Sequence, residues 1–245
     1  ITGQVWLRKN EVVHHVGKHV TRSMGIPITN VKALKENVTP VQELPIVSGQ
    51  TYAQAHPSYP FDSPEELPMP HLKVILNGTT YYTDAAGGFT SGESGDILSV
   101  PFALEGRWSQ VYTDGVIPSE NIDLQEGNNE INVPGNVKET SAYRSVNLIH
   151  DHMKLWMPEF TGLDFPLTTN IDVEGECNAF CDGGSINFFD TGGGCNPTSL
   201  IADVVYHEYG HAINGYFYNS LGSGFSNGAM NEGYADFWAM SLGED

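Results

Sequence analysis

Two histidines and a glutamate form the pattern with the clearest chemistry in this sequence. His207, Glu208 and His211 belong to the pentapeptide HEYGH. On a helix, residues four apart project from the same face, so the two imidazoles can bind one Zn²⁺ from one side. Glu208 lies about 100° around the helix from His207 and can reach a water molecule at the metal without ligating it. A general base requires that position. The alternative is a polar helix with two solvated or core histidines.

A second segment supplies carboxylates at a suitable distance along the chain. Glu232 lies 21 residues after His211, enough chain to turn through the Gly/Ser/Asn-rich stretch 219–228 and enter another helix. Catalytic zinc takes three protein ligands and keeps a fourth position open, and Glu232 can supply the third ligand. Asp236 follows Glu232 by four residues, so both face the same way. It can accept the free ring N–H of a zinc histidine and fix its tautomer.

Both segments must be helical if the site is to form. Apolar residues share a helical face with the two histidines, and Asn196 followed by Pro197 is typical of an N-cap and the first helical position. The second helix is expected from about Gly228 onward. Its aromatic residues indicate a largely buried element, which disfavours a merely solvated acidic face. These residues are Tyr234, Phe237 and Trp238.

The two motifs together resemble the gluzincin metallopeptidases, and within them the thermolysin and fungalysin groups. The resemblance rests on DVVYHEYGHAIN (Asp203–Asn214) and GAMNEGYADFW (Gly228–Trp238), and it covers roughly residues 140–245. It implies a secreted zinc endopeptidase that acts on a protein or peptide substrate. The roles that it implies are zinc ligation by His207, His211 and Glu232, general base catalysis by Glu208, and orientation of a zinc histidine by Asp236.

The resemblance also implies a substrate contact and a second cation. In this family an Asn-Ala-aromatic triplet lies in the edge strand that binds the substrate, and Asn178-Ala179-Phe180 precedes the zinc helix here. Asn178 and the backbone of Ala179 would then hold an extended peptide by strand addition. Asp203 matches a calcium ligand of thermolysin-like enzymes, which makes Ca²⁺ a candidate; the alternative is a solvated helix aspartate.

One departure from the family bears directly on activity. The family's oxyanion-stabilising His or Tyr comes from a helical half downstream of the glutamate ligand, whereas this chain ends at Asp245. Oxyanion stabilisation is often the largest catalytic term. We therefore expect a segment of a longer protein, whose C-terminal half completes the catalytic domain from the same or another chain. The alternative function is a non-catalytic fragment of a surface or filament protein, with a structural or degenerate zinc site and a partner-binding β-rich region.

The fold is expected to be α+β, with a β-rich accessory region followed by the zinc-binding half of a thermolysin-like domain, the C-terminal helical half being absent. The accessory region spans 1–135. Its five prolines at about 57–70 predict a linker. Residues 71–135 resemble the β-sandwich modules of secreted bacterial enzymes, and Asn77-Gly78 is a strong two-residue hairpin signal.

The period of apolar residues changes near residue 136, where the zinc-binding subdomain (136–245) is expected to begin. Apolar residues recur at helical spacing and predict an amphipathic helix over roughly 140–157, which Pro158 ends. The residues on its apolar face are Tyr143, Val146, Ile149, Met153 and Trp156. In the same helix His150 and His152 flank Asp151. Adjacent helical positions diverge by about 100°, so we interpret the two histidines as structural.

Three cysteines lie close together, between residues 177 and 195. Cys177 and Cys181 in one strand would be about 13 Å apart, too far for a bond. We favour Cys177–Cys195, which would join the edge strand to the start of the zinc helix and leave Cys181 free. Cys181–Cys195 stays open as the alternative.

The charge of the chain excludes two classes of partner. Its 11 Lys and Arg against 30 Asp and Glu give a formal net charge of −19. Nucleic-acid binding needs a basic surface, and so does docking on anionic membranes. No apolar run approaches the ~20 residues that cross a bilayer, so we expect no membrane insertion.

Overall fold

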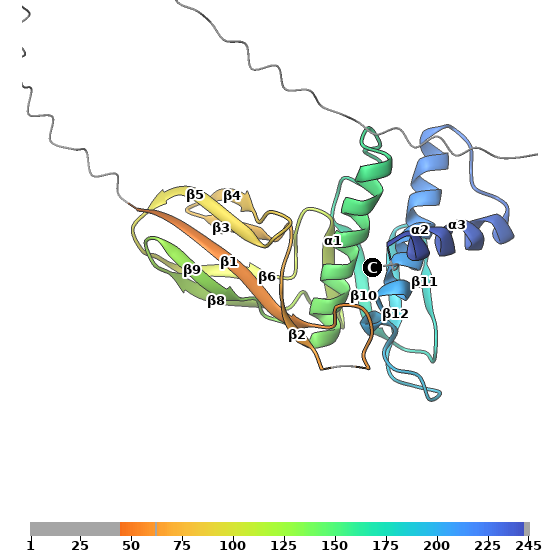
Figure 1. The fold of residues 1–245 in the computed structure, drawn as a ribbon, viewed down its shortest axis with the longest axis horizontal. Helices are drawn as coiled ribbons and strands as arrows, with labels where there is room; N and C mark the ends of the chain where they lie inside the picture. Colours follow the sequence, from red (N-terminus) through yellow and green to blue (C-terminus); the bar gives the residue numbers. More distant parts are fainter. Residues whose placement is uncertain (1–44, 62, 243–245) are drawn as a thin grey trace, which may run out of the picture. The chain divides into compact units, whose positions relative to one another are not determined.

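The structure is a computed structural model that describes residues 45–61 and 63–242. The start of the predicted accessory region, residues 1–44, lies outside this described part. Three α-helices and several β-sheets make up the described residues (Figure 1), which confirms the α+β class. None of these helices is long and apolar enough to cross a membrane.

Eight of the nine strands before the first long helix form one four-stranded sheet and two strand pairs, and the ninth, β7, belongs to a second four-stranded sheet. β1 pairs antiparallel with β2 and β5 and parallel with β9, while β3 pairs with β4 and β6 with β8. Whether these strands pack as a sandwich stays a prediction. The strands are β1 (Ile46–Ala55), β2 (Glu65–Pro68), β3 (Lys73–Leu76), β4 (Thr79–Tyr82), β5 (Gly88–Ser94), β6 (Ile97–Ala103), β7 (Ser109–Thr113), β8 (Ser119–Leu124) and β9 (Asn128–Asn132).

The predicted hairpin is confirmed. Leu76 of β3 pairs directly with Thr79 of β4, so Asn77 and Gly78 alone form the turn. Both have positive φ, 47° and 84°, as a type I′ turn requires.

The Pro-rich stretch 57–70 contains more structure than a linker. β2 lies within it and pairs with the second half of β1, at the end of the sheet. Proline is tolerated on such an edge strand because one side of the strand makes no ladder hydrogen bonds. Met69, directly after β2, is fully buried.

A mixed sheet in the order β11-β12-β10-β7 supports the candidate site. Its later strands are β10 (Leu167–Val173), β11 (Ala179–Cys181) and β12 (Ser185–Phe189). β10 runs parallel to β7 and β12, and β11 pairs antiparallel with β12 at the edge. Because β7 precedes residue 135 and β10 follows it, this sheet crosses the predicted boundary between the accessory region and the zinc-binding subdomain.

Helix α1 (Val137–Trp156) confirms the predicted helix and packs against both β1 and α2 (Figure 1). Asn136 begins it with a capping box to Glu139. The apolar residues from Tyr143 to Met153 on its predicted core face are fully buried. Trp156 is not: its side chain is 67% exposed, because the buried face ends one turn earlier, at Met153.

Helix α2 (Ala202–Ser220) carries the HEYGH motif but begins later than predicted. Asn196 and Pro197 do not cap it; Pro197 caps a short 3₁₀ turn, η1 (Thr198–Leu200), and Ile201 then caps α2. Ile201 offers no side-chain cap. The backbone N–H of Ala202 donates to the carbonyl of Ser58 instead, and Asp203 places a favourable negative charge in the first turn of α2.

Helix α3 (Gly228–Leu242) carries Glu232 and crosses α2 (Figure 1). The prediction of a largely buried helix is wrong. Only Ala235 and Ala239 are buried, while Tyr234 and Phe237 are 42% and 58% exposed. Gly210 of α2 and Ala235 meet where the two helices approach each other closely, and Trp238 is partly buried against the core.

Candidate metal centre

Helix α2 holds His207 and His211 at the rim of the core. Val205, Tyr209 and Ile213 on its inner face are buried, whereas the side chains of the two histidines are 23% and 12% exposed. Their Nε2 atoms lie 3.0 Å apart. Two imidazole nitrogens at this distance share either a proton or a cation.

Glu232 of α3 completes a group of three donors. Its Oε2 lies 3.2 Å from His207 Nε2 and 3.4 Å from His211 Nε2, and one ligand atom from each residue falls within 4.8 Å of the others. Ligands held at ~2.0–2.1 Å around a tetrahedral ion are separated by about 3.3 Å. The group therefore fits a metal ion. Among the described residues, no other set of His, Cys, Asp and Glu side chains converges in this way.

Asp236 lies one turn beyond Glu232 and contacts His207 at the ring nitrogen that faces away from the donor group. Its Oδ1 is 2.8 Å from His207 Nδ1. Bound to the carboxylate in this way, Nδ1 carries the proton, so Nε2 presents its lone pair to a metal. The structure thus brings Asp236 to the position predicted for it.

Glu208 is nearly buried beside the three donors. It is 6% exposed, and its Oε2 has no hydrogen-bond partner. Burial raises the pKa of Glu208 to about 7; His207 opposes the shift, Glu232 adds to it, and the backbone N–H of Cys181 opposes it. A cation bound by the three donors would lower this pKa again. A positioned carboxyl group with an oxygen free of other partners can take a proton and return it.

Two adjoining cavities, of about 430 Å³ and 310 Å³, meet at Glu208 and His207. Asn178 and Ala179 line both of them. Ala179 begins β11, whose outer edge is unpaired in the sheet. A larger cavity of about 700 Å³ lies against β1 and β5 and contains none of the predicted site residues.

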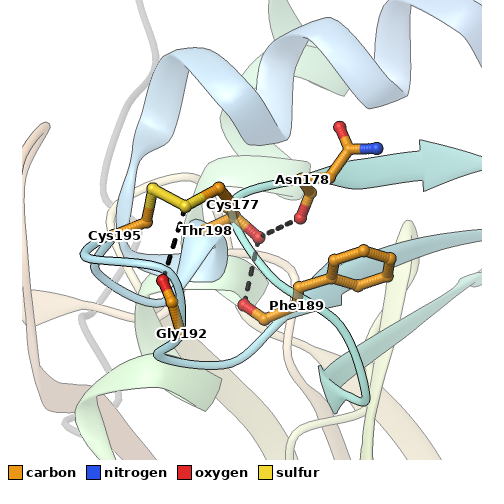
Figure 2. Close-up of a disulfide and its surroundings, with 6 residues drawn as sticks. All are labelled: Cys177, Asn178, Phe189, Gly192, Cys195 and Thr198. Atoms are coloured by element: carbon orange, nitrogen blue, oxygen red, sulfur yellow. Dashed lines mark hydrogen bonds between the residues drawn. A yellow bond between two sulfur atoms is a disulfide. The ribbon is translucent and has the colours of Figure 1, made fainter.

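The predicted disulfide is confirmed. Cys177 and Cys195 are bonded, with their Cα atoms 5.3 Å apart, and join the segment before β11 to the segment before η1. Figure 2 shows the hydroxyl of Thr198 donating to the carbonyls of Asn178 and Phe189, while the amide of Asn178 points away from the disulfide. The bond and these contacts together set the position of Asn178 relative to α2.

Cys181 is the free cysteine, as expected. It ends β11 and lines the smaller cavity with Glu208 and Glu232. Burial raises the pKa of its thiol to about 11, which makes it a poor nucleophile at neutral pH.

Asp203 has a neighbour that the sequence did not indicate. The hydroxyl of Tyr59 donates to its Oδ2. Asp203 belongs to no converging set of carboxylates in the described part of the chain, so the proposed calcium role gains no support here.

A pair of asparagines that sequence reasoning missed connects the two helices of the site. The side-chain amide of Asn214 donates to the backbone carbonyl and to Oδ1 of Asn231, at 3.2 Å and 3.0 Å. Asn231 is the residue before Glu232, so this contact positions the third donor. Asn214 follows His207 by seven residues, or two helical turns, and that spacing was an available signal.

His150 and His152 lie apart from the donor group. His150 is fully buried, with its ring stacked on Trp108 at 3.9 Å between centroids. His152 Nε2 lies 2.9 Å from the hydroxyl of Ser241 in α3.

These contacts describe a pocket in which two imidazoles and a carboxylate can bind a metal beside a buried carboxyl group. No protein-family model and no curated protein matches this sequence. The functional assignment therefore depends on this geometry and on the motifs.

Proposed function

We propose that this chain carries the catalytic centre of a secreted zinc-dependent endopeptidase. The observation that carries the proposal is the position of Glu208, which is nearly buried with an unpartnered Oε2 beside three converging metal donors. Two imidazoles and a carboxylate are the ligand set of catalytic zinc sites that keep one position open. The gluzincin motifs and the disulfide, which is typical of oxidising compartments, support the same proposal.

Each residue has a definite task in this proposal. A bound Zn²⁺ supplies Lewis-acid chemistry at the carbonyl of the substrate and at the attacking water. Glu208 takes the proton from that water through Oε2 and returns it to the amine of the leaving product. Asp236 keeps Nε2 of His207 free for the metal. The open edge of β11 pairs with the peptide backbone.

The alternative, a structural or degenerate zinc site, accounts less well for two features. Structural zinc sites are usually closed by four protein ligands, whereas three donors converge among the described residues. A structural site also gains nothing from the unpartnered buried oxygen of Glu208, which lowers the stability of the fold, whereas a general base needs such an oxygen.

The test compares the full-length gene product with its Glu208→Gln variant. Zinc content is measured by atomic emission, and peptide cleavage is followed by mass spectrometry on casein. We expect both proteins to bind one equivalent of zinc, with cleavage by the variant reduced at least 100-fold, the size of a general-base contribution. Equal cleavage by the two proteins contradicts the role of Glu208. Zinc binding without cleavage by either favours the structural alternative.

A further inference from the structure

The 430 Å³ cavity beside Glu208 combines apolar walls with negative charge. Val204 of α2 and Ala239 and Met240 of α3 contribute aliphatic surface. Carboxyl groups of Asp203 and Asp236 line it as well. A purely apolar pocket would suit an aliphatic or aromatic side chain, but this cavity offers a charge that such a side chain leaves unpaired.

Asp203 is the carboxylate in this cavity that is not committed to the metal centre. Asp236 is hydrogen-bonded to His207, and Glu208 is the proposed general base. Asp203 accepts one hydrogen bond, from the hydroxyl of Tyr59 to Oδ2, and its Oδ1 accepts none from the described residues. This hydrogen bond and the negative charge together raise the pKa of Tyr59, so the phenol stays neutral beside the carboxylate.

Among the described residues, no Lys or Arg side chain neutralises this charge. Every Lys and Arg in the described part of the chain lies outside the cavity, and three of them pair with carboxylates elsewhere. These basic residues are Lys73, Arg107, Lys138, Arg144 and Lys154. Besides His207, a metal ligand in the proposed centre, and the neutral residues Asn178 and Thr198, the cavity therefore presents aliphatic surface and acidic groups without a Lys or Arg partner.

We propose that this cavity binds the side chain of a lysine or arginine adjacent to the scissile bond of a peptide substrate. The proposal rests on the proposed endopeptidase function and names its substrate class. The aliphatic stem of the lysine or arginine lies against Val204, Ala239 and Met240. Its charged end binds Asp203. Long cationic side chains characteristically bury their methylene stems while keeping the charged head at a polar group.

Binding is tested first, with peptides that cannot be cleaved. The probes are acetyl-Ala-Ala-Xaa-Ala-amide and acetyl-Ala-Xaa-Ala-Ala-amide, each with a ketomethylene group replacing the central amide and with Lys, Arg, Gln or Met as Xaa. Affinity for the zinc-loaded protein is measured by calorimetry at 50 mM and 1 M NaCl. In one of the two positions we expect Lys and Arg to bind about five-fold more tightly than Gln or Met, the size of one partly exposed ion pair. This preference shrinks at 1 M NaCl because salt screens the pair.

Two variants test whether the preference for Lys and Arg arises from the cavity. Asp203→Asn removes the charge and is expected to abolish the preference without weakening Met binding. Glu120→Gln removes one charge from an exposed position of β8, far along the chain from the site, and is expected to leave the preference unchanged. Equal affinity for Lys, Gln and Met in the unaltered protein overturns the inference. Persistence of the preference in Asp203→Asn also overturns it.

Cleavage is measured separately, with the same peptides carrying a normal amide bond. If the cation preference is found in binding but no peptide is hydrolysed, the proposed endopeptidase function fails and the side-chain site stands. If hydrolysis occurs with no preference in either assay, the function stands and the side-chain site is wrong.

Discussion

His207 Nδ1 lies 2.8 Å from Asp236 Oδ1, so the imidazole that would bind the metal from α2 is held by a carboxylate from α3. The side chain of Asp236 is 65% exposed, whereas that of His207 is 23% exposed. An exposed acid thereby fixes the tautomer and orientation of a largely buried ring. The relationship makes the metal site a property of two helices rather than of the HEYGH motif alone.

Replacement of Asp236 is expected to weaken metal binding. Loss of such a contact typically costs 10- to 100-fold in affinity, so Asp236→Ala should lower the zinc affinity by about that factor. Alanine favours helix, so α3 is not destabilised by the substitution itself. Competition with a chromophoric chelator measures the affinity. Glu159→Gln, which alters an exposed acid outside the site, serves as the control. Unchanged affinity in Asp236→Ala contradicts the role assigned to the contact.

The close approach of α2 and α3 depends on Gly210. A Cβ at this position would lie 2.8 Å from the Cα of Ala235 and 3.2 Å from its carbonyl oxygen. Backbone cannot move aside easily, so Gly210→Ala should destabilise the fold by about 1–3 kcal/mol and weaken zinc binding by displacing Glu232.

Gly215 in the same helix provides the matched control. A Cβ there meets nothing within 4 Å, so Gly215→Ala should stabilise the protein by up to about 1 kcal/mol through helix propensity. Urea unfolding of both variants gives the comparison. A change of the unfolding free energy in the same direction for both substitutions would contradict a packing role for Gly210.

Removal of the disulfide is expected to destabilise the segment that carries Asn178. The bond closes a loop with a sequence separation of 18, for which chain entropy predicts about 3 kcal/mol. Cys195→Ser should therefore unfold at lower urea concentration, and a reductant should have no further effect on it. Cys181→Ser should keep the response of the unaltered protein to reductant. If reductant leaves the unaltered protein's urea midpoint unchanged, the bond contributes no stability.

Acid stability depends on Asp151 in α1. Burial favours its protonated form, but His150 and His71 outweigh burial and lower the pKa of Asp151 from 3.8 to about 2. His71 Nε2 is the closer partner, 2.7 Å from Oδ2, whereas His150 Nδ1 is 4.0 Å from Oδ1. A depressed carboxyl pKa stabilises the fold above the unfolded value of about 4, and this stability is lost as the pH falls towards 2.

The corresponding measurement is urea unfolding between pH 5 and pH 2. Asp151→Asn should be less stable than the unaltered protein at pH 5, and the difference should disappear as pH 2 is approached. A difference that stays constant over this range would show that the carboxylate of Asp151 is not stabilised by its histidine neighbours.

The sequence by itself determined the elements and the chemical types of the site. The i, i+4 spacing placed His207 and His211 on one helical face, and Asn77-Gly78 predicted a two-residue hairpin turn. Both predictions held because each depends only on local backbone geometry. The reach of the side chains excluded only Cys177–Cys181. Cys177–Cys195 was favoured over Cys181–Cys195, and the structure decided between the two. Local signals were weaker at helix boundaries, where Asn196-Pro197 resembled a cap that the chain does not use.

Only the tertiary structure decided how the two helices meet and which residues surround the site. Three contacts join positions far apart in the chain. They are the close approach of Gly210 to Ala235 and the hydrogen bonds from Asn214 to Asn231 and from Tyr59 to Asp203. The exposure of Tyr234 and Phe237 was likewise outside the reach of sequence patterns. An aromatic residue on a helix predicts burial only if a neighbouring element covers it, and that depends on packing between elements rather than on local spacing.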